Sequence, residues 1–142
     1  MLSDLRSHLA ALQVEAKEPP PVVDFRLYFD GNDEEDCIAP NQWLEGRPPI
    51  AQMYRRLSDI AQQPDVERVL VGLHSDWRHP SYDGGYPPGE NVHIYSTASK
   101  SAIESWLQGW QFDVVRTGWP YGKSRTAPEP SPGFTVYTVC WD

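Results

Sequence analysis

The stretch Val66–Leu73, with the sequence VERVLVGL, decides how the chain is expected to fold. It is nearly continuous in Val and Leu and too brief for a good helix, so it predicts a central strand buried on both faces. Just upstream, apolar residues recur at helical spacing over residues 50–60, after two prolines that favour a helix start. Downstream, an irregular stretch over residues 75–90 precedes a further strand over residues 91–96. The centre of the chain therefore predicts helix, strand, loop and strand.

The N-terminal third is expected to add a helix, a spacer, a strand and a loop. Four leucines lie on one stripe in residues 1–16, which indicates an amphipathic helix. Residues 17–21 form a stiff, Pro-rich spacer that lets this helix dock on the body of the domain or on a second copy. Residues 22–29 alternate between apolar and polar side chains, as in a strand with one buried face. The long loop over residues 30–46 begins with five acidic residues in seven positions.

The C-terminal part is expected to add one helix and two strands. The S-x-x-E pattern at residues 101–104 fits a capping box, with Ser99 as an alternative cap, and the apolar stripe behind it reaches Trp110. Strands are predicted over residues 112–116 and residues 134–141, with a loop rich in Pro and Gly between them.

This order of elements predicts an α+β fold. The six middle elements match the ferredoxin-like split βαβ pattern, in which two helices cover one face of an antiparallel sheet. The N-terminal helix and the last strand would be additions, the strand at a sheet edge or beside a neighbour. A chain of 142 residues can bury one core, so a single domain is expected over residues 1–142, with residues 22–142 as its body.

Composition and charge restrict the classes of function. The net charge of −8, with only 12 scattered Lys and Arg residues, argues against a nucleic-acid partner. No apolar run is long enough for a membrane span, and the start of the chain lacks the pattern of a signal peptide, so a cytoplasmic location is expected. Cys37 and Cys140 form neither a disulfide framework nor a zinc ligand set and are interpreted as free thiols. The acidic neighbours of Cys37 are expected to raise its pKa, which disfavours a nucleophile.

Two segments partly match the sequence patterns of known ligand-binding loops, but each lacks residues that the pattern requires. Residues 118–124, GWPYGKS, have three residues between the glycines where a phosphate-binding P-loop has four, and prolines follow where its helix should begin. In the acidic loop, oxygen ligands stand at alternate positions, but Glu35 and Asn41 replace the Gly and Glu that a calcium loop requires. No cofactor and no established catalytic set are therefore predicted.

Histidines are the strongest candidates for chemistry. His74, Asp76 and His79 follow the buried strand directly, and His93 lies in the strand expected to pair with it. Such a cluster could bind a transition metal or supply a general base, and the bland alternative is a set of solvated surface imidazoles.

Tryptophans and acids suggest an interaction surface. Trp43, Trp77 and Trp119 fall in the three long loops, with Tyr82, Tyr86 and Tyr121 near them in sequence. Rings of this kind form interface hot spots, unless the loops fold back over the sheet and bury them. The acids expected to engage a basic partner with these tryptophans are Asp30, Asp33, Glu34, Glu35 and Asp36.

In size, acidity and loop character, the chain resembles the bacterial immunity proteins that neutralise a cognate toxin. The resemblance implies a non-enzymatic protein-binding domain whose carboxylates engage basic residues around a toxin's active site while its rings fill the cleft. The alternative is a small metal-dependent enzyme or ligand-binding domain that uses His74, His79 and His93. A homodimer joined through the first helix and the last strand is a further possibility.

Overall fold

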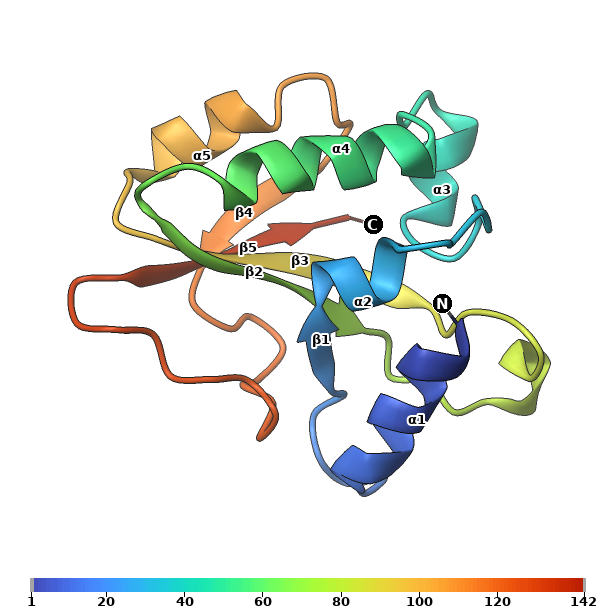
Figure 1. The fold of residues 1–142 in the computed structure, drawn as a ribbon. Coiled ribbons are helices and arrows are strands. Elements are labelled where there is room, and N and C mark those ends of the chain that lie inside the picture. The colour runs from blue at the N-terminus through green and yellow to red at the C-terminus, as the bar shows by residue number, and fades with distance from the viewer. Residues whose placement is uncertain (1, 142) are drawn as a thin grey trace.

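A five-stranded antiparallel sheet forms the centre of the computed structural model, which describes residues 2–141 (Figure 1). The strands are β1 (Val22–Asp24), β2 (Val66–Leu73), β3 (Gly89–Ser96), β4 (Val114–Thr117) and β5 (Thr135–Cys140). Their order in the sheet is β1-β2-β3-β5-β4, and all four neighbouring pairs are antiparallel. The prediction of an α+β fold is confirmed.

Helices of different lengths surround this sheet. They are α1 (Leu2–Leu12), α2 (Phe25–Phe29), α3 (Pro40–Leu44), α4 (Ile50–Ala61) and α5 (Lys100–Trp106), with a 3₁₀ helix, η1 (Pro80–Tyr82). In Figure 1, α4 and α5 lie over one face, and the loop between β4 and β5 passes under the other. None of the helices described between residues 2 and 141 is both long and apolar enough to cross a bilayer.

The predicted strand over residues 22–29 is wrong in its second half, which is helix α2. Asp24 ends β1 and caps the helix, because its Oδ1 accepts a hydrogen bond from the backbone N–H of Arg26 at 2.8 Å. Phe25, Tyr28 and Phe29 are all buried, at spacings of three and four residues. The stretch carries a strand-like and a helix-like apolar pattern together, and packing against α4 selects the helix.

The ferredoxin-like strand order is not the observed one. In a split βαβ unit, two parallel strands joined by a helix are separated by a third strand. Here β1 and β2 are adjacent and antiparallel, with Val23 opposite Val71. The last strand, predicted at an edge or beside a neighbour, is not at an edge, since β5 lies between β3 and β4.

Several local predictions are confirmed. Strand β2 has the predicted bounds, and α4 buries four residues of its predicted apolar face. Helix α5 is capped by the alternative residue, Ser99, whose side chain accepts from the backbone N–H of Ala102 at 3.2 Å. The helix ends at Trp106, and Trp110 is buried in the turn that follows.

The first helix and the last strand are both used within the chain. Leu5 and Leu9 of α1 are buried in the main core. Arg125 ties the end of α1 to the loop after β4, through its bonds to Glu18 Oε1 at 2.7 Å and to the carbonyl of Leu12 at 3.0 Å. Strand β5 pairs with a neighbour on each side. The features that suggested a homodimer therefore have partners in this chain.

Candidate functional site

A cavity of about 220 Å³ lies between the sheet and the start of the loop after β4. It opens on the face of the sheet that α4 and α5 leave uncovered. Its lining combines sheet residues with loop residues 119–122 and Ser124. Those from the sheet and the turn after β2 include Gly72, His74, Glu90, Asn91 and His93.

Gly72 gives the cavity its depth. A Cβ atom at this position would overlap Asn91 Oδ1 and lie 2.8 Å from His93 Nε2. The sheet pairs Gly72 directly with Asn91, so the missing side chain leaves room for polar groups of the neighbouring strand. The glycine thus serves close packing of side chains and not an unusual backbone angle.

A chain of hydrogen bonds fixes the protonation of His93. The Oγ1 atom of Thr138 lies 2.7 Å from the carbonyl oxygen of Gly118, which can only accept, so the threonine hydroxyl donates there. The Nδ1 atom of His93 lies 2.7 Å from the same Oγ1 and must therefore carry a proton and donate it. In the neutral ring, Nε2 is then an unprotonated acceptor.

Burial keeps this imidazole neutral. His93 is 5% exposed, and burial lowers its pKa from the ordinary 6.5 to about 3. Within the described residues, Nε2 accepts no hydrogen bond from the protein. At neutral pH the cavity therefore holds a buried lone pair that a bound N–H or O–H group can use.

Asn91 supplies a second buried polar group, two residues before His93 on the same face of β3. It is 5% exposed, and in the described part of the chain its amide makes no hydrogen bond to protein. Side-chain amides offer both a donor and an acceptor. Asn91 and His93 therefore offer the cavity a donor and two acceptors that no protein group in the described residues uses.

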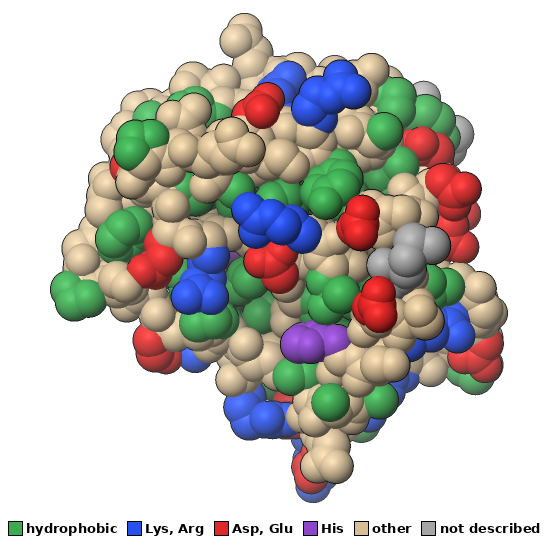
Figure 2. Space-filling model, viewed as in Figure 1, with side chains coloured by type: hydrophobic (Ala, Val, Ile, Leu, Met, Phe, Trp, Pro, Cys, Tyr) green, Lys and Arg blue, Asp and Glu red, His purple; other side chains and the backbone are tan. Residues whose placement is uncertain are grey.

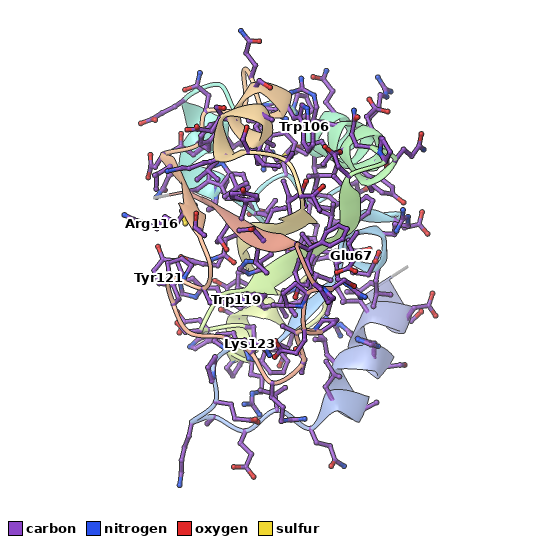
Figure 3. All side chains as sticks on the ribbon, turned by 90° about the vertical axis from the view of Figure 1, so that its left-hand side faces the viewer. Glu67, Trp106, Arg116, Trp119, Tyr121 and Lys123 are labelled. Carbon is purple, nitrogen blue, oxygen red and sulfur yellow. The ribbon has the colours of Figure 1, made fainter. Side chains whose placement is uncertain are left out.

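The loop contributes a flat aromatic wall. The ring centroids of Trp119 and His93 are 4.4 Å apart, and Trp119 also meets Tyr95 edge-on. In Figure 3, Trp119 lies against the sheet, Tyr121 points outward and Trp106 lies far away among the helices. Trp119 is therefore half-buried over the cavity.

The four candidate residues of the histidine cluster do not form one site. His74 and His93 line the cavity, and His74 Nε2 lies 3.5 Å from the carboxylate of Glu90. His79 instead accepts from the backbone N–H of Ser81 at the start of η1, outside the cavity, and Asp76 is exposed. Across residues 2–141, no three His, Cys, Asp or Glu side chains are placed to hold one metal ion. The metal alternative is therefore not supported.

The segment that imitates a P-loop is part of the cavity wall but provides no phosphate site. The Nζ atom of Lys123 donates to the carbonyl of Ala127 at 3.2 Å and pairs with Glu129 at 2.9 Å. No Lys or Arg lines the cavity. Lys123 is thus engaged outside the cavity lining, and the segment presents no cation to a phosphate in the cavity.

Two residues of the acidic loop have structural roles. Glu34 accepts from the backbone N–H of Tyr86 at 2.6 Å, and Glu35 accepts from buried Arg47 at 2.6 Å. Asn32 is turned inward, donating to the carbonyl of Tyr28, so the alternating calcium-like ligands do not converge. The exposed acids of the predicted surface are Asp30, Asp33 and Asp36.

The three tryptophans predicted to lie in loops have different surroundings, and Trp43 lies in helix α3 instead. Trp43 is 36% exposed and has the Arg47 guanidinium 4.8 Å from its ring centroid, which links it to Glu35 and the acidic loop. Trp77 and Trp119 are half-buried against separate hydrophobic clusters. Figure 2 shows acidic side chains gathered on the side where α3 lies. The predicted surface therefore reduces to three aspartates and Trp43.

Cys37 and Cys140 are both buried, and no disulfide joins them. Burial raises the pKa of Cys37 to about 11, and the nearby charge of Glu34 adds a smaller effect. The direction agrees with the prediction, but its main cause is burial. Cys37 is held as a thiol at neutral pH and is not an activated nucleophile.

Sequence reasoning missed Gly72 and Asn91, which line the cavity, and Thr138, which bonds to His93 behind it. One signal was available, since an isolated glycine within an apolar strand indicates a close approach of neighbouring atoms. The pairing of Asn91 with Gly72 and of His93 with Thr138 depends on strand register, which a single sequence does not give.

Comparison with known proteins places the chain in a family. Residues 2–139 match the uncharacterized protein YfbO family. The chain belongs to this family. No curated protein and no solved structure matches it. Membership of the YfbO family covers nearly the whole chain, and the family's description assigns no activity.

Proposed function

We propose that this domain binds a small polar organic molecule in the cavity between the uncovered sheet face and the Trp119 loop. The observation that carries the proposal is a pair of polar groups, His93 Nε2 and the Asn91 amide, that belong to buried residues of the cavity lining and make no hydrogen bond to the described part of the protein. Both groups line the cavity, so a molecule bound there can form hydrogen bonds with both.

Binding rather than catalysis is the simpler function for these groups. A histidine whose pKa is held near 3 by burial is a weak base at neutral pH, although its lone pair remains a good acceptor. The nearest carboxylate, Glu90, is engaged with His74 at the more exposed side of the cavity.

A fragment screen tests this proposal. Neutral, anionic and cationic fragments would be added separately to the wild-type chain and to a Gly72→Ala variant, and the melting temperature recorded. Ligands stabilise the state that binds them, so at least one fragment should raise the melting temperature of the wild type but not of the variant. Equal effects on both proteins would contradict binding in this cavity.

We also propose a second function, in which the acidic side binds a basic protein, as an immunity protein binds its toxin. It is supported by a set of contacts beside the exposed aspartates. Arg47 forms an ion pair with Glu35, and its guanidinium lies over the exposed ring of Trp43. Charges arranged in this way speed association with a basic partner.

Substitution of Asp30, Asp33 and Asp36 by Asn tests this second function without disturbing the structural glutamates. The matched control removes three exposed charges elsewhere, with Asp59→Asn, Glu104→Gln and Asp113→Asn. A basic protein captured at low salt should associate more slowly with the first variant and with a flatter salt dependence. Equal association rates for both variants would remove the acidic side from the mechanism.

A further inference from the structure

We infer that the ligand of the cavity is an uncharged, amino-substituted nitrogen heterocycle, the chemical class of adenine and cytosine. Its ring would lie beside Trp119, and its donor edge would bond to His93 and Asn91. This inference rests on the proposed small-ligand function and adds the class of molecule.

The charge of the lining excludes anions. No Lys or Arg lines the cavity, and Lys123, the nearest cation in sequence to the Trp119 wall, is engaged with Ala127 and Glu129. A carboxylate or phosphate would instead face the Nε2 lone pair of His93 and the Glu90 carboxylate. Burial of an anion without a cationic partner is costly, so the ligand must present donors.

The polar groups of the cavity indicate which donors and acceptors one edge of the ligand presents. His93 Nε2 can only accept, and Asn91 can both donate and accept. Both atoms lie next to the position that a Gly72 side chain would occupy, so one ligand edge can reach them together. An amino group adjacent to a ring nitrogen has this pattern, and asparagine recognises adenine through the same pair of groups.

The wall and the volume indicate a flat molecule of one or two rings. Trp119, Pro20 and Pro120 provide flat apolar surfaces, and Trp119 is held over the sheet by its contacts with His93 and Tyr95. The cavity volume of about 220 Å³ is that of roughly seven water molecules in the liquid. It is smaller than the cavities of about 300 Å³ and more that hold drug-sized ligands.

Titration of the ¹⁵N-labelled full chain tests the class of ligand. The probes are adenine and cytosine, the oxo analogues hypoxanthine and uracil, the anion benzoate and the cation benzylamine. The signal followed is the indole N–H of Trp119, assigned with a Trp119→Phe variant. Adenine or cytosine should shift this signal saturably, and the matching oxo analogue should bind at least tenfold more weakly.

Variants of cavity residues test whether the change in the Trp119 signal comes from binding in the cavity. Gly72→Ala and Asn91→Ala should each weaken binding at least tenfold, and either variant serves if the other fails to fold. His8→Gln, which changes an exposed histidine on α1, is the control and should bind as the wild type does.

Equal affinity for the amino and oxo compounds, or tighter binding of benzoate or benzylamine, would overturn the heterocycle class. If these heterocycles leave Trp119 unchanged while another fragment shifts it, the class is wrong but the small-ligand function stands. If no fragment of any charge shifts Trp119, the small-ligand function itself fails.

Discussion

The two faces of the sheet are built from the same strands but differ in chemistry. On the helix-covered face, Val71, Val92, Ile94 and Val139 are fully buried in one continuous apolar core. On the loop-covered face, alternate residues of those strands include Gly72, Asn91, His93 and Thr138, arranged around a cavity. The period of two in a strand separates these roles residue by residue.

The contrast indicates that one face serves stability, whereas the other carries the polar groups of the proposed binding site. Apolar burial stabilises the first face, at about 1.5–3 kcal/mol for each large side chain. On the second face, a smaller apolar cluster around Leu70, Tyr95 and Val136 supports the polar groups beside it. The polar residues themselves leave hydrogen-bonding capacity unused, which is expected of a site and not of a core.

The largest expected difference is between neighbours on β3. Ile94→Ala should lower the free energy of unfolding by about 3 kcal/mol, because it leaves a void in the helix-face core. Asn91→Ala should lower it by less than about 1 kcal/mol, because no internal hydrogen bond is lost. Urea denaturation of both variants measures the contrast, and similar losses would show that the cavity face is as important for stability as the core.

The next effect depends on pH. His93 is neutral when folded until the pH approaches 3, but its unfolded-state pKa is near 6.5, so below pH 6.5 the unfolded chain binds more protons. Its contribution to stability is therefore complete above about pH 7 and declines as the pH falls, by about 2 kcal/mol at pH 5. The stabilities of wild type and His93→Gln at pH 7 and pH 5 check this. A loss equal in both proteins would contradict it.

A smaller effect concerns the orientation of the imidazole. Thr138→Val removes the hydroxyl between His93 and Gly118, at a cost of about 1 kcal/mol. The ¹⁵N signals of the ring should show Nε2 as the unprotonated nitrogen in the wild type and lose that preference in the variant. Thr138→Ser retains the hydroxyl and should keep the wild-type tautomer. The same tautomer in all three proteins would show that Thr138 does not select it.

The smallest effect is expected in the segment that imitates a P-loop. Lys123→Gln should change the free energy of unfolding by less than about 0.5 kcal/mol, since the ion pair with Glu129 is largely exposed. Affinity for a neutral ligand should also stay the same. A large loss of affinity for inorganic phosphate in this variant would indicate an anion site and reverse the assignment of the cavity.

The sequence supports local predictions better than long-range ones. The apolar run of β2 and the stripe of α4 contain their own periodicity, so both elements could be predicted with nearly correct bounds. Residues 22–29 could not, because Phe25, Tyr28 and Phe29 fit a helix while the alternating residues fit a strand. The strand order depends on pairings between residues far apart in the chain, such as Val23 with Val71.

The site was predicted in part for the same reason. His74 and His93 do line one cavity, as expected of residues on adjoining strands, whereas His79 is diverted by its bond to the backbone at Ser81. The roles of Asn91 and Gly72 could not be predicted, because they depend on the strand register that places the two residues opposite each other.

Gly72 lies in the interior of β2 without the positive φ that would require glycine, so its backbone admits an alanine. A single methyl group there would overlap Asn91 Oδ1 and lie 2.8 Å from His93 Nε2, so these side chains would have to move. A relative that carries this exchange should keep the fold and lose the proposed ligand. Among members of the family, the residue at this position should therefore sort those that bind from those that do not.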